Sequence, residues 1–386
     1  MFERWIQLPD HRSCLIVGPR RCGKTTLLRH RYPSWPYATL DDLDFLEWSR
    51  RDPKGFITQL GRHGIVDEIQ RLPILTVAVK YAIDNQGARL FLTGSSTIGL
   101  LDAAADTLAG RVEIISLPTA CWGEDLGAPT HSIFQDKLDP LRIKDADRRL
   151  QEAMTYGQFP EVLGQKDAER KREVLINYRN TYFTRDLMQL SNIENLEGLR
   201  ALFQHLGRSL GSHLEVSAFA REAGISFPTA KKYLNALHQA ELTFRLYGYQ
   251  YGPAKRYVKA AKTYFADNGV LYGLSSHSSQ GQLLENFVLA ELEKRRKLGF
   301  IKTDQFYFYK SAAGNEIDLV FEVDDEVYAV EVKSSTRPGP RDFRNLRSFS
   351  DSRKRKVNRY LFYMGTEYET IDDIRMIPVA ALFRGV

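Results

Sequence analysis

The stretch that decides the fold is SCLIVGPRRCGKT, residues 13–25. Its apolar first part, Ser13–Val17, predicts a buried strand, and the residues from Lys24 to about His30 predict a helix. Between them, Gly18-Pro19-Arg20-Arg21-Cys22-Gly23-Lys24-Thr25 fits every fixed position of the pattern GxxxxGKS/T. In this context of strand, loop and helix, the pattern indicates a phosphate-binding loop.

The residue types of this loop suit ATP bound together with Mg²⁺. Glycines let backbone N–H groups converge on one phosphate, and the N-terminus of the following helix adds positive potential. We expect Lys24 to reach the β- and γ-phosphates and the Thr25 hydroxyl to bind Mg²⁺. The alternative is a glycine-rich turn beside an unrelated lysine. The expected ATP contacts are Gly18, Pro19, Arg20, Arg21, Cys22, Gly23, Lys24, Thr25 and Thr26.

A second apolar strand, Gly64–Val66, ends in two carboxylates, Asp67 and Glu68. Ligands of open α/β sheets bind at the carboxyl ends of the strands, so both side chains are expected beside the phosphate loop. We predict that Asp67 holds Mg²⁺ through water and that Glu68 is the general base that polarises the attacking water. The alternative is a pair of solvated acids at a strand end.

Two further residues are candidates for catalysis. Thr93-Gly94-Ser95-Ser96 ends another strand, and a hydroxyl there could hydrogen-bond the attacking water or the γ-phosphate; we favour Ser95, with little to separate it from Ser96. Arg111 is the arginine best placed to respond to phosphate charge, from within the chain or from a neighbouring subunit. The alternatives are a turn that only ends the strand and an arginine on the surface or in an ion pair.

Short strands alternate with helical patterns over the first 120 residues, which argues for a parallel α/β sheet. Residues 123–148 are predicted to form a loop, helical patterns dominate from about 147 to 239, and strands return after residue 305. We therefore predict an α/β multidomain chain: an ATPase-like domain at 1–150, a helical region at 151–275 and an α/β domain at 276–386. Strands are expected at 13–17, 37–40, 64–66, 88–92 and 111–117, and helices at 24–30, 41–51 and 74–85.

The segments GPRRCGKTTLL, VDEIQRLP, LTGSS and LAGRVEIISLP occur in this order along the chain. This order resembles prokaryotic AAA-type ATPases related to the archaeal ATPases. The later segments YFTRDL, SNIEN, ISFPTAKKYL, KTYFADNGV and LLENFVLAEL are similar to the C-terminal domain of unknown function that accompanies this ATPase. The resemblance covers nearly the whole chain and implies an AAA+-like core, with the phosphate-loop strand next to the fourth strand. Asp267-Asn268-Gly269 departs from the Asp-Thr-Gly expected there, outside the nucleotide site.

A helix-turn-helix pattern occupies the middle of the chain. Residues 215–223 predict a short helix, Gly224-Ile225 a tight turn, and Ser226 the cap of a second helix. Predicted strands at 242–249 and 263–266 bracket a basic loop, so residues 200–266 look like a winged helix. Winged helices also serve as protein-interaction modules, and this alternative stays open. The candidate DNA contacts are Lys231, Lys232, Lys255 and Arg256.

A constellation of acidic residues follows in the C-terminal part. Glu285 lies in a predicted helix, and Asp318 on a predicted strand that can pair with the next one. Glu331 and Lys333 share one face of that next strand, because residues i and i+2 point to the same side. This arrangement resembles restriction-endonuclease-like nucleases, in which carboxylates hold a divalent metal and a lysine helps water attack a phosphodiester.

We expect Mg²⁺ or Mn²⁺ at these four residues, because only Lys333 would offset the three carboxylates and uncompensated buried charge is costly. The alternatives are a degenerate nuclease that only binds nucleic acid and a simple ion pair between Glu331 and Lys333.

Composition narrows the class of protein. The chain has 386 residues, of which 43% are hydrophobic and 26% charged, which excludes wholesale disorder, collagen and a coiled coil. No apolar run is long enough to insert into a membrane, and the N-terminal residues do not resemble a signal peptide. Cys14, Cys22 and Cys121 form no CxxC pair, so we expect reduced thiols in a cytoplasmic protein.

The net charge is +6, and its distribution is uneven. Lysine and arginine exceed acidic residues by seven in residues 200–263 and again by seven in residues 337–359. This favours a surface that faces a polyanion such as DNA, a solvated face being the alternative. The leading function is Mg²⁺-dependent ATP hydrolysis coupled to nucleic acid, to a partner protein or to a homo-oligomer. The alternatives are an ATP-gated, metal-dependent DNA nuclease and a nucleotide-dependent signalling scaffold without DNA binding.

Overall fold

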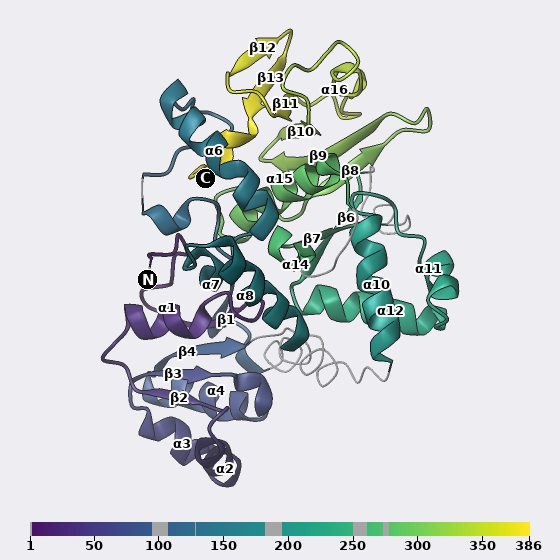
Figure 1. Ribbon diagram of the computed structural model, residues 1–386. Helices are drawn as coiled ribbons and strands as arrows, with labels where there is room; N and C mark the ends of the chain where they lie inside the picture. The colour runs from purple at the N-terminus through teal and green to yellow at the C-terminus, as the bar shows by residue number, and fades with distance from the viewer. Residues whose placement is uncertain (1, 95–106, 128, 182–194, 250–260, 273–277) are drawn as a thin grey trace. The chain divides into compact units, whose positions relative to one another are not determined.

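The computed structural model describes residues 2–94, 107–127, 129–181, 195–249, 261–272 and 278–386 (Figure 1). The chain divides into two compact units. The N-terminal unit comprises residues 4–119 together with 239–241. The C-terminal unit comprises residues 120–238 and 242–386, with the first three residues of the chain.

The N-terminal unit is built on a five-stranded sheet in the order β2-β3-β4-β1-β5. Every pairing in this sheet is parallel, so the carboxyl ends of its strands meet at one edge. β1 lies next to β4, the neighbour that the resemblance implies for the phosphate-loop strand. The strands are β1 (Ser13–Val17), β2 (Tyr37–Thr39), β3 (His63–Asp67), β4 (Arg89–Gly94) and β5 (Val112–Ser116).

Helices connect these strands and enclose the core of the N-terminal unit. Within the described residues they are α1 (Lys24–Arg31), α2 (Leu43–Arg51), α3 (Pro53–Gln59) and α4 (Leu75–Gln86). α2 begins where the Asp42 carboxylate accepts the backbone N–H groups of Asp44 and Phe45, which caps the first turn. Apolar side chains of α2, α3 and α4 pack with those of β1, β3 and β4 in one buried cluster.

The C-terminal unit is built on an eight-stranded mixed sheet in the order β12-β13-β11-β10-β9-β8-β6-β7. β9 and β10 form the antiparallel hairpin that the sequence predicts. The strands are β6 (Thr243–Gly248), β7 (Lys262–Phe265), β8 (Tyr307–Lys310), β9 (Glu316–Val323), β10 (Glu326–Lys333), β11 (Val357–Tyr363), β12 (Glu369–Ile371) and β13 (Ile374–Pro378).

A separate apolar cluster covers each face of this sheet. α15 (Gln280–Lys297) packs on one face, and α16 (Arg344–Ser348) on the other. Alternate residues of a strand therefore enter different clusters: Val330 contacts the α15 cluster, whereas Ala329 contacts the α16 cluster. α15 starts with a capping box, in which Ser279 and Gln282 satisfy each other's backbone N–H groups.

Helices make up the rest of the C-terminal unit. α10, α11 and α12 precede the β6–β7 hairpin, which is the order of elements that the winged-helix prediction requires. Residues 250–260, which contain the predicted wing, lie outside the described residues. The helices are α6 (Pro140–Tyr156), α7 (Pro160–Leu163), α8 (Ala168–Thr181), α10 (Leu196–Arg208), α11 (Val216–Glu222), α12 (Phe227–Gln239) and α14 (Asn268–Tyr272).

The structure differs from the predicted domain limits in two places. β6 pairs with β8 as well as β7, so the predicted middle and C-terminal domains share one sheet across residue 275. The loop predicted over residues 123–148 is wrong for 140–148, where α6 already begins. α6 starts there because Pro140 occupies its first position and the Asp139 carboxylate accepts the N–H groups of Leu141 and Arg142. Residues 120–150 consequently fold with the C-terminal unit.

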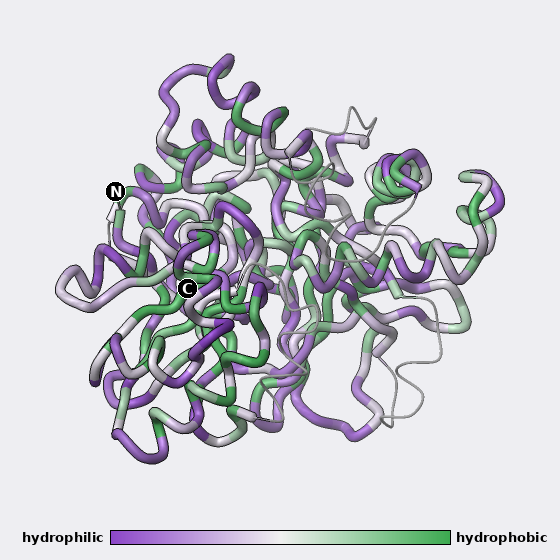
Figure 2. The backbone as a smooth tube through the Cα atoms, turned by 90° about the horizontal axis from the view of Figure 1, so that it is seen from below, coloured by the Kyte–Doolittle hydropathy of each residue, from purple (hydrophilic) through white to green (hydrophobic). Residues whose placement is uncertain are grey.

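Hydrophobic residues are distributed in short stretches along the backbone, with hydrophilic residues between them (Figure 2). In the described part of the chain, no helix is both long enough and apolar enough to cross a membrane. The three cysteines are buried and unpaired with one another.

Candidate nucleotide site

The loop between β1 and α1 has a backbone that only particular residues allow. A Cβ on Gly18 would approach the Leu117 carbonyl oxygen to 2.2 Å, so this position accepts no side chain. Gly23 has φ of 98°, a conformation open to glycine but rarely to other residues. Arg21 also has positive φ, 61°, and its side chain is exposed. Glycine at the first and sixth positions of the motif is therefore a requirement of the loop itself.

Lys24 lies inside this loop and is only 5% exposed. Its Nζ donates hydrogen bonds to the Gly18 carbonyl oxygen at 2.9 Å and to the Pro19 carbonyl oxygen at 3.0 Å. The ammonium is therefore held at the carbonyl groups of the loop. Cys22, fully buried, has its Sγ 3.9 Å from the same ammonium.

Asp67 is the centre of a hydrogen-bonded group at the carboxyl edge of the sheet. Its Oδ2 accepts the Thr25 hydroxyl at 2.8 Å and the Tyr37 hydroxyl at 2.7 Å. Its Oδ1 accepts the Thr93 hydroxyl. Burial and the hydrogen bond to Asp67 raise the pKa of the Tyr37 phenol, which therefore stays a donor at neutral pH. Asp67 and Thr25, predicted to share one Mg²⁺ ion, are thus direct neighbours.

Glu68 follows with φ of 58° and ψ of 42°, in the left-handed region that non-glycine residues seldom adopt. Its backbone N–H donates to the Thr93 hydroxyl at 3.3 Å, and Gln70 Nε2 donates to its carboxylate. β3 ends at Asp67, and the chain turns sharply at Glu68. The two neighbouring carboxylates therefore have different partners: Thr25 and Tyr37 for Asp67, and Gln70 for Glu68.

Sequence reasoning missed Tyr37 and Thr93 as parts of this site. Tyr37 begins β2, the strand that pairs with β3, and Thr93 is the penultimate residue of β4, the strand on the other side of β3. The signal was available: both are hydroxyl side chains on strands that flank the predicted Asp67 strand. The favoured hydroxyl, Ser95, and its neighbour Ser96 lie outside the described residues.

Arg111 does not belong to this site within the chain, which corrects the prediction of an internal role. It immediately precedes β5, whereas the phosphate loop follows the carboxyl end of β1, and the two strands are parallel. Arg111 instead forms an exposed ion pair with Asp84 of α4, at 2.7 Å. The ion pair is the alternative that the sequence left open. Arg111 lies at the amino ends of the parallel strands, whereas the phosphate loop follows the carboxyl end of β1.

The residues predicted to contact DNA are only partly described. Lys231 and Lys232 are exposed on α12. α12 is capped as predicted, because the Ser226 hydroxyl accepts the Thr229 N–H at 3.2 Å. Lys255 and Arg256 lie outside the described residues.

The basic segment 337–359 is less exposed to a polyanion than its composition suggests. Arg355 contacts Asp351 and Glu322, and other cations of the segment pair with acidic residues of β10 and of the β12–β13 turn. These pairs neutralise part of the predicted positive surface. Exposed cations remain at Arg337, Arg341, Arg344, Arg353 and Lys354.

The acidic constellation of the C-terminal unit is brought together largely as predicted. Lys333 Nζ lies 2.5 Å from the Glu331 carboxylate, so these side chains do point together. Asp318 pairs with the same strand, and its carboxylate accepts the Val332 N–H at 2.9 Å. Glu285 reaches the group from α15 and accepts the Tyr264 hydroxyl at 2.7 Å.

The charge balance of this constellation differs from the prediction that Lys333 is its only cation. Lys262 of β7 is 3% exposed and pairs with Glu316, and the carboxylates of Asp318 and Glu316 raise its pKa although burial lowers it. Two lysines, Lys262 and Lys333, therefore offset part of the negative charge, and Lys262 also pairs with a fourth carboxylate, Glu316. Within the described residues, no group of three or more histidine, cysteine or acidic side chains is arranged to hold a metal ion.

Two of these carboxyl groups are shifted toward the neutral form. Burial and the Asp318 carboxylate raise the pKa of Glu285 to about 7. The same two causes raise the pKa of Glu331 to about 8, although Lys333 lowers it. A cation that entered the cluster would therefore have to displace protons as well as lysine contacts.

Comparisons with known proteins match three successive parts of the chain. Residues 10–126 match a family described as an AAA domain. Residues 147–281 and 280–382 match two families described as domains of unknown function, DUF8612 and DUF4143.

Similar proteins occur in bacteria and archaea. The chain is 26% identical over 336 residues to uncharacterized proteins of Mycobacterium bovis and Mycobacterium tuberculosis, covering 84% of this chain and 70% of theirs. It is 25% identical over 344 residues to an uncharacterized protein of Methanocaldococcus jannaschii, covering 84% of this chain and 76% of that one. With the parallel sheet and the phosphate loop described above, these matches identify an AAA domain at residues 10–126, joined to C-terminal sequence that belongs to domains of unknown function.

Proposed function

We propose that the AAA domain binds ATP with Mg²⁺ and hydrolyses it. The observation that carries this proposal is the contact between the Thr25 hydroxyl and Asp67 Oδ2, 2.8 Å, beside the buried Lys24 ammonium. It joins the hydroxyl that follows the phosphate loop to a carboxylate 42 residues further along the chain. Steady-state ATP turnover of the wild-type chain and of variants at Lys24 and Glu68 tests the proposal.

The side chains present fit Mg²⁺, since hydroxyl and carboxylate oxygens are the ligands it prefers. Thr25 and Asp67 would hold it, and a bound Mg²⁺ neutralises charge on the β- and γ-phosphates. Lys24 exchanges the Gly18 and Pro19 carbonyl oxygens for phosphate oxygens. Glu68 orients and polarises the attacking water, and Thr93 fixes Asp67 and the Glu68 backbone relative to each other.

We further propose that the nucleotide state is coupled to nucleic acid through α12. Lys231 and Lys232 are exposed on this helix. It is the second helix of the predicted helix-turn-helix, and in DNA-binding proteins the second helix contacts the bases. The competing interpretation is a protein-interaction module. Binding to a partner protein would not depend on contacts between these lysines and DNA phosphates.

The salt dependence of DNA binding separates these interpretations. We expect the affinity of the full chain for duplex DNA to fall by about 0.9 log units per phosphate contact for each log unit of salt. Lys231→Glu with Lys232→Glu should remove most of the binding, and charge reversal at Lys255 and Arg256 should remove more. Lys166→Glu, a charge reversal at an exposed residue between α7 and α8, is the matched control and should change little. Binding that ignores salt, or no binding at about 50 mM salt, supports the protein-interaction or scaffold interpretation.

A second candidate function is metal-dependent cleavage of nucleic acid by the C-terminal unit. The observation that favours it is the position of Asp318 beside Glu331 and Lys333 on paired strands. A metal ion that bound here would compete with Lys262 for the carboxylates and with the protons that the raised pKa values of Glu285 and Glu331 indicate.

Metal binding by this cluster should therefore strengthen with pH. We expect Mn²⁺ to bind the nucleotide-free full chain more tightly at pH 8 than at pH 6, because Glu285 and Glu331 release protons over this interval. Asp318→Asn should weaken that binding, whereas Asp67→Asn reports the contribution of the nucleotide site. Equal Mn²⁺ affinity in wild type and Asp318→Asn at both pH values would dismiss the site. Metal binding without cleavage of plasmid DNA would indicate a degenerate nuclease that retains only binding.

A further inference from the structure

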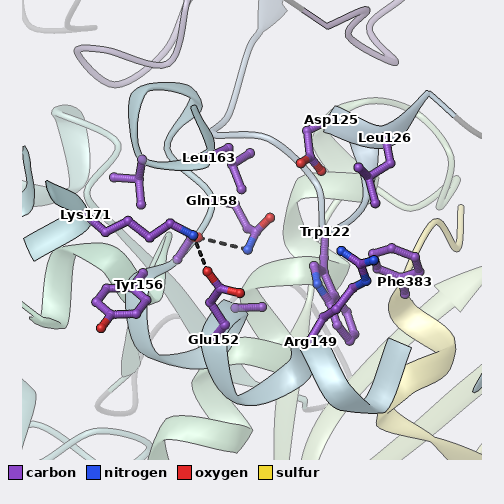
Figure 3. A pocket seen from close by; sticks show the side chains of 13 residues that line it. Trp122, Asp125, Leu126, Arg149, Glu152, Tyr156, Gln158, Leu163, Lys171 and Phe383 are labelled. Carbon is purple, nitrogen blue, oxygen red and sulfur yellow. Dashed lines mark hydrogen bonds and ion pairs between the residues drawn. The ribbon is translucent and has the colours of Figure 1, made fainter. Parts of the chain in front are cut away.

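A cavity of about 200 Å³ lies entirely within the C-terminal unit, and its lining shares no residue with the acidic cluster (Figure 3). Its walls come from α6, α7 and α8, from the segment after Ala120 and from Phe383 near the C-terminal end of the described chain. Trp122, Tyr156 and Phe383 give it aromatic surface. Charged and polar side chains line the cavity as well: Asp125, Arg149, Glu152, Gln158 and Lys171.

The side-chain oxygen of Gln158 is buried in this cavity without a hydrogen-bond partner. The residue is only 2% exposed. Its Nε2 donates to the Gly157 carbonyl oxygen at 2.9 Å. This bond determines the orientation of the amide, because the reversed amide would place two oxygens against each other. In Figure 3 Gln158 lies between the Lys171–Glu152 pair and Asp125.

The backbone keeps Gln158 in this place. Gly157, which ends α6, has φ of 68°, and a Cβ there would approach Asp267 Oδ1 to 1.8 Å. The Gln158 backbone N–H in turn donates to both Asp267 carboxylate oxygens at 3.1 Å. The unpartnered oxygen is thus held by a rigid turn, and a buried acceptor left unsatisfied costs free energy that a ligand donor would recover.

The charged residues of the cavity determine what kind of donor fits. Lys171 is already paired with Glu152, and Arg149 lies 3.4 Å from Asp145. Burial raises the pKa of Asp125, although Arg149 and Arg384 lower it, so the carboxylate lacks full compensation for its burial. Gln158 Oε1 and the Asp125 carboxylate are therefore the acceptors that the cavity offers to a ligand, and Arg149 also lines it.

We propose that this cavity binds a small molecule through a primary ammonium group, which donates to Gln158 Oε1 and lies beside Asp125. The aromatic side chains would contact the carbon atoms next to the ammonium; the rings of Tyr156 and Phe383 already face the cations of Lys171, Arg149 and Arg384. A cavity of 200 Å³ is smaller than the roughly 300–1,000 Å³ of sites for drug-sized ligands, so the ligand is about as large as an amino acid. This site is independent of the proposed ATP hydrolysis.

Two sources supply this chemistry: a free amino acid and an aliphatic diamine. Isothermal titration calorimetry on the nucleotide-free full chain, with alanine, lysine and 1,4-diaminobutane as probes, distinguishes them. If only the amino acids bind, the site also recognises the carboxylate of the ligand. If only the diamine binds, the site excludes a ligand carboxylate. Either result supports the ammonium site. Propionate and 1,4-butanediol lack the ammonium and should not bind.

Variants at Gln158 decide the role of its oxygen. Gln158→Leu removes the acceptor at similar size and should weaken ammonium binding by about tenfold or more. Gln158→Glu keeps an acceptor and adds negative charge, but it also places a carboxylate oxygen against the Gly157 carbonyl oxygen in place of the Nε2 donor. Where this variant folds, it should bind the same probe at least as tightly as wild type. Gln151→Leu, at an exposed residue of α6, is the matched control and should leave binding unchanged.

Three results would overturn the proposal. The first is failure of every amine probe to bind at millimolar concentration, which would indicate that water alone satisfies Gln158. The second is equal affinity of wild type and Gln158→Leu, or weaker binding by a folded Gln158→Glu. The third is binding of propionate or the diol as tight as that of the amines. If Gln158→Leu does not fold, Gln158→Glu and Asp125→Asn still decide, since Asp125→Asn should weaken ammonium binding.

Discussion

Glu68→Gln is expected to bind ATP with wild-type affinity and to lose hydrolysis by about 10²–10⁴-fold, the usual contribution of a general base. The amide keeps the size of the side chain and leaves Asp67 and Thr25 untouched, so the groups that hold the nucleotide remain. Lys24→Ala is expected to lose ATP affinity by about tenfold to a hundredfold, since a charge-assisted contact to phosphate disappears.

Equilibrium binding of a fluorescent ATP analogue and steady-state phosphate release separate the two effects. Matched controls are Glu47→Gln and Lys54→Ala, two exposed residues of the same unit, which should behave as wild type in both measurements. Equal loss of ATP affinity in Glu68→Gln and Lys24→Ala would show that the roles given to these residues are wrong. Full turnover in Glu68→Gln would remove Glu68 as the base.

The second large effect is expected on the stability of the C-terminal unit, from Glu291→Gln. Glu291 is 1% exposed on α15 and accepts the Trp122 backbone N–H and Lys294 Nζ, both at 2.9 Å. Arg295, fully buried, contacts the same carboxylate. Burial alone would raise the pKa of Glu291, but Lys294 and Arg295 outweigh it and hold the pKa below its usual value.

Neutralising this carboxylate removes a negative charge from beside two buried cations. Lys294 keeps the Asp267 carboxylate at 2.8 Å, whereas the carbonyl oxygens of Glu291, Leu382 and Gly385 that Arg295 contacts carry no formal charge. We therefore expect the free energy of unfolding to fall by about 3 kcal/mol, near the lower end of the range for a broken buried ion pair.

Urea unfolding followed by tryptophan fluorescence measures this change. The control is Glu173→Gln, in the exposed Arg170–Glu173 pair at 2.8 Å, which has the same helical spacing as Lys294–Glu291 and should cost at most about 1 kcal/mol. Because the pKa of Glu291 is lowered on folding, its contribution to stability is present above its unfolded pKa and lost as the pH falls through the folded value. A loss in Glu291→Gln no larger than in Glu173→Gln would contradict the buried-network interpretation.

Local sequence alone determined the nucleotide loop and its chemistry. The run Ser13–Val17 is β1 to the residue, α1 begins at Lys24, and Gly23 has a φ that other residues rarely adopt. Such features depend on neighbouring residues only, so a pattern can specify them. The shared face of Glu331 and Lys333 was predictable for the same reason, because the two-residue period of a strand is a local property.

Tertiary structure decided which partners these residues have. Tyr37 and Thr93 reach Asp67 because β2 and β4 flank β3, and Lys262 balances Asp318 because β7 folds back beside residues more than 50 positions away. One sheet crosses the predicted boundary near residue 275 because β6 pairs with β8, about 60 residues further along the chain. The cavity around Gln158 likewise joins residues 122–171 with Phe383. Pairings over such separations depend on how whole strands and helices pack, and no local pattern of residues specifies them.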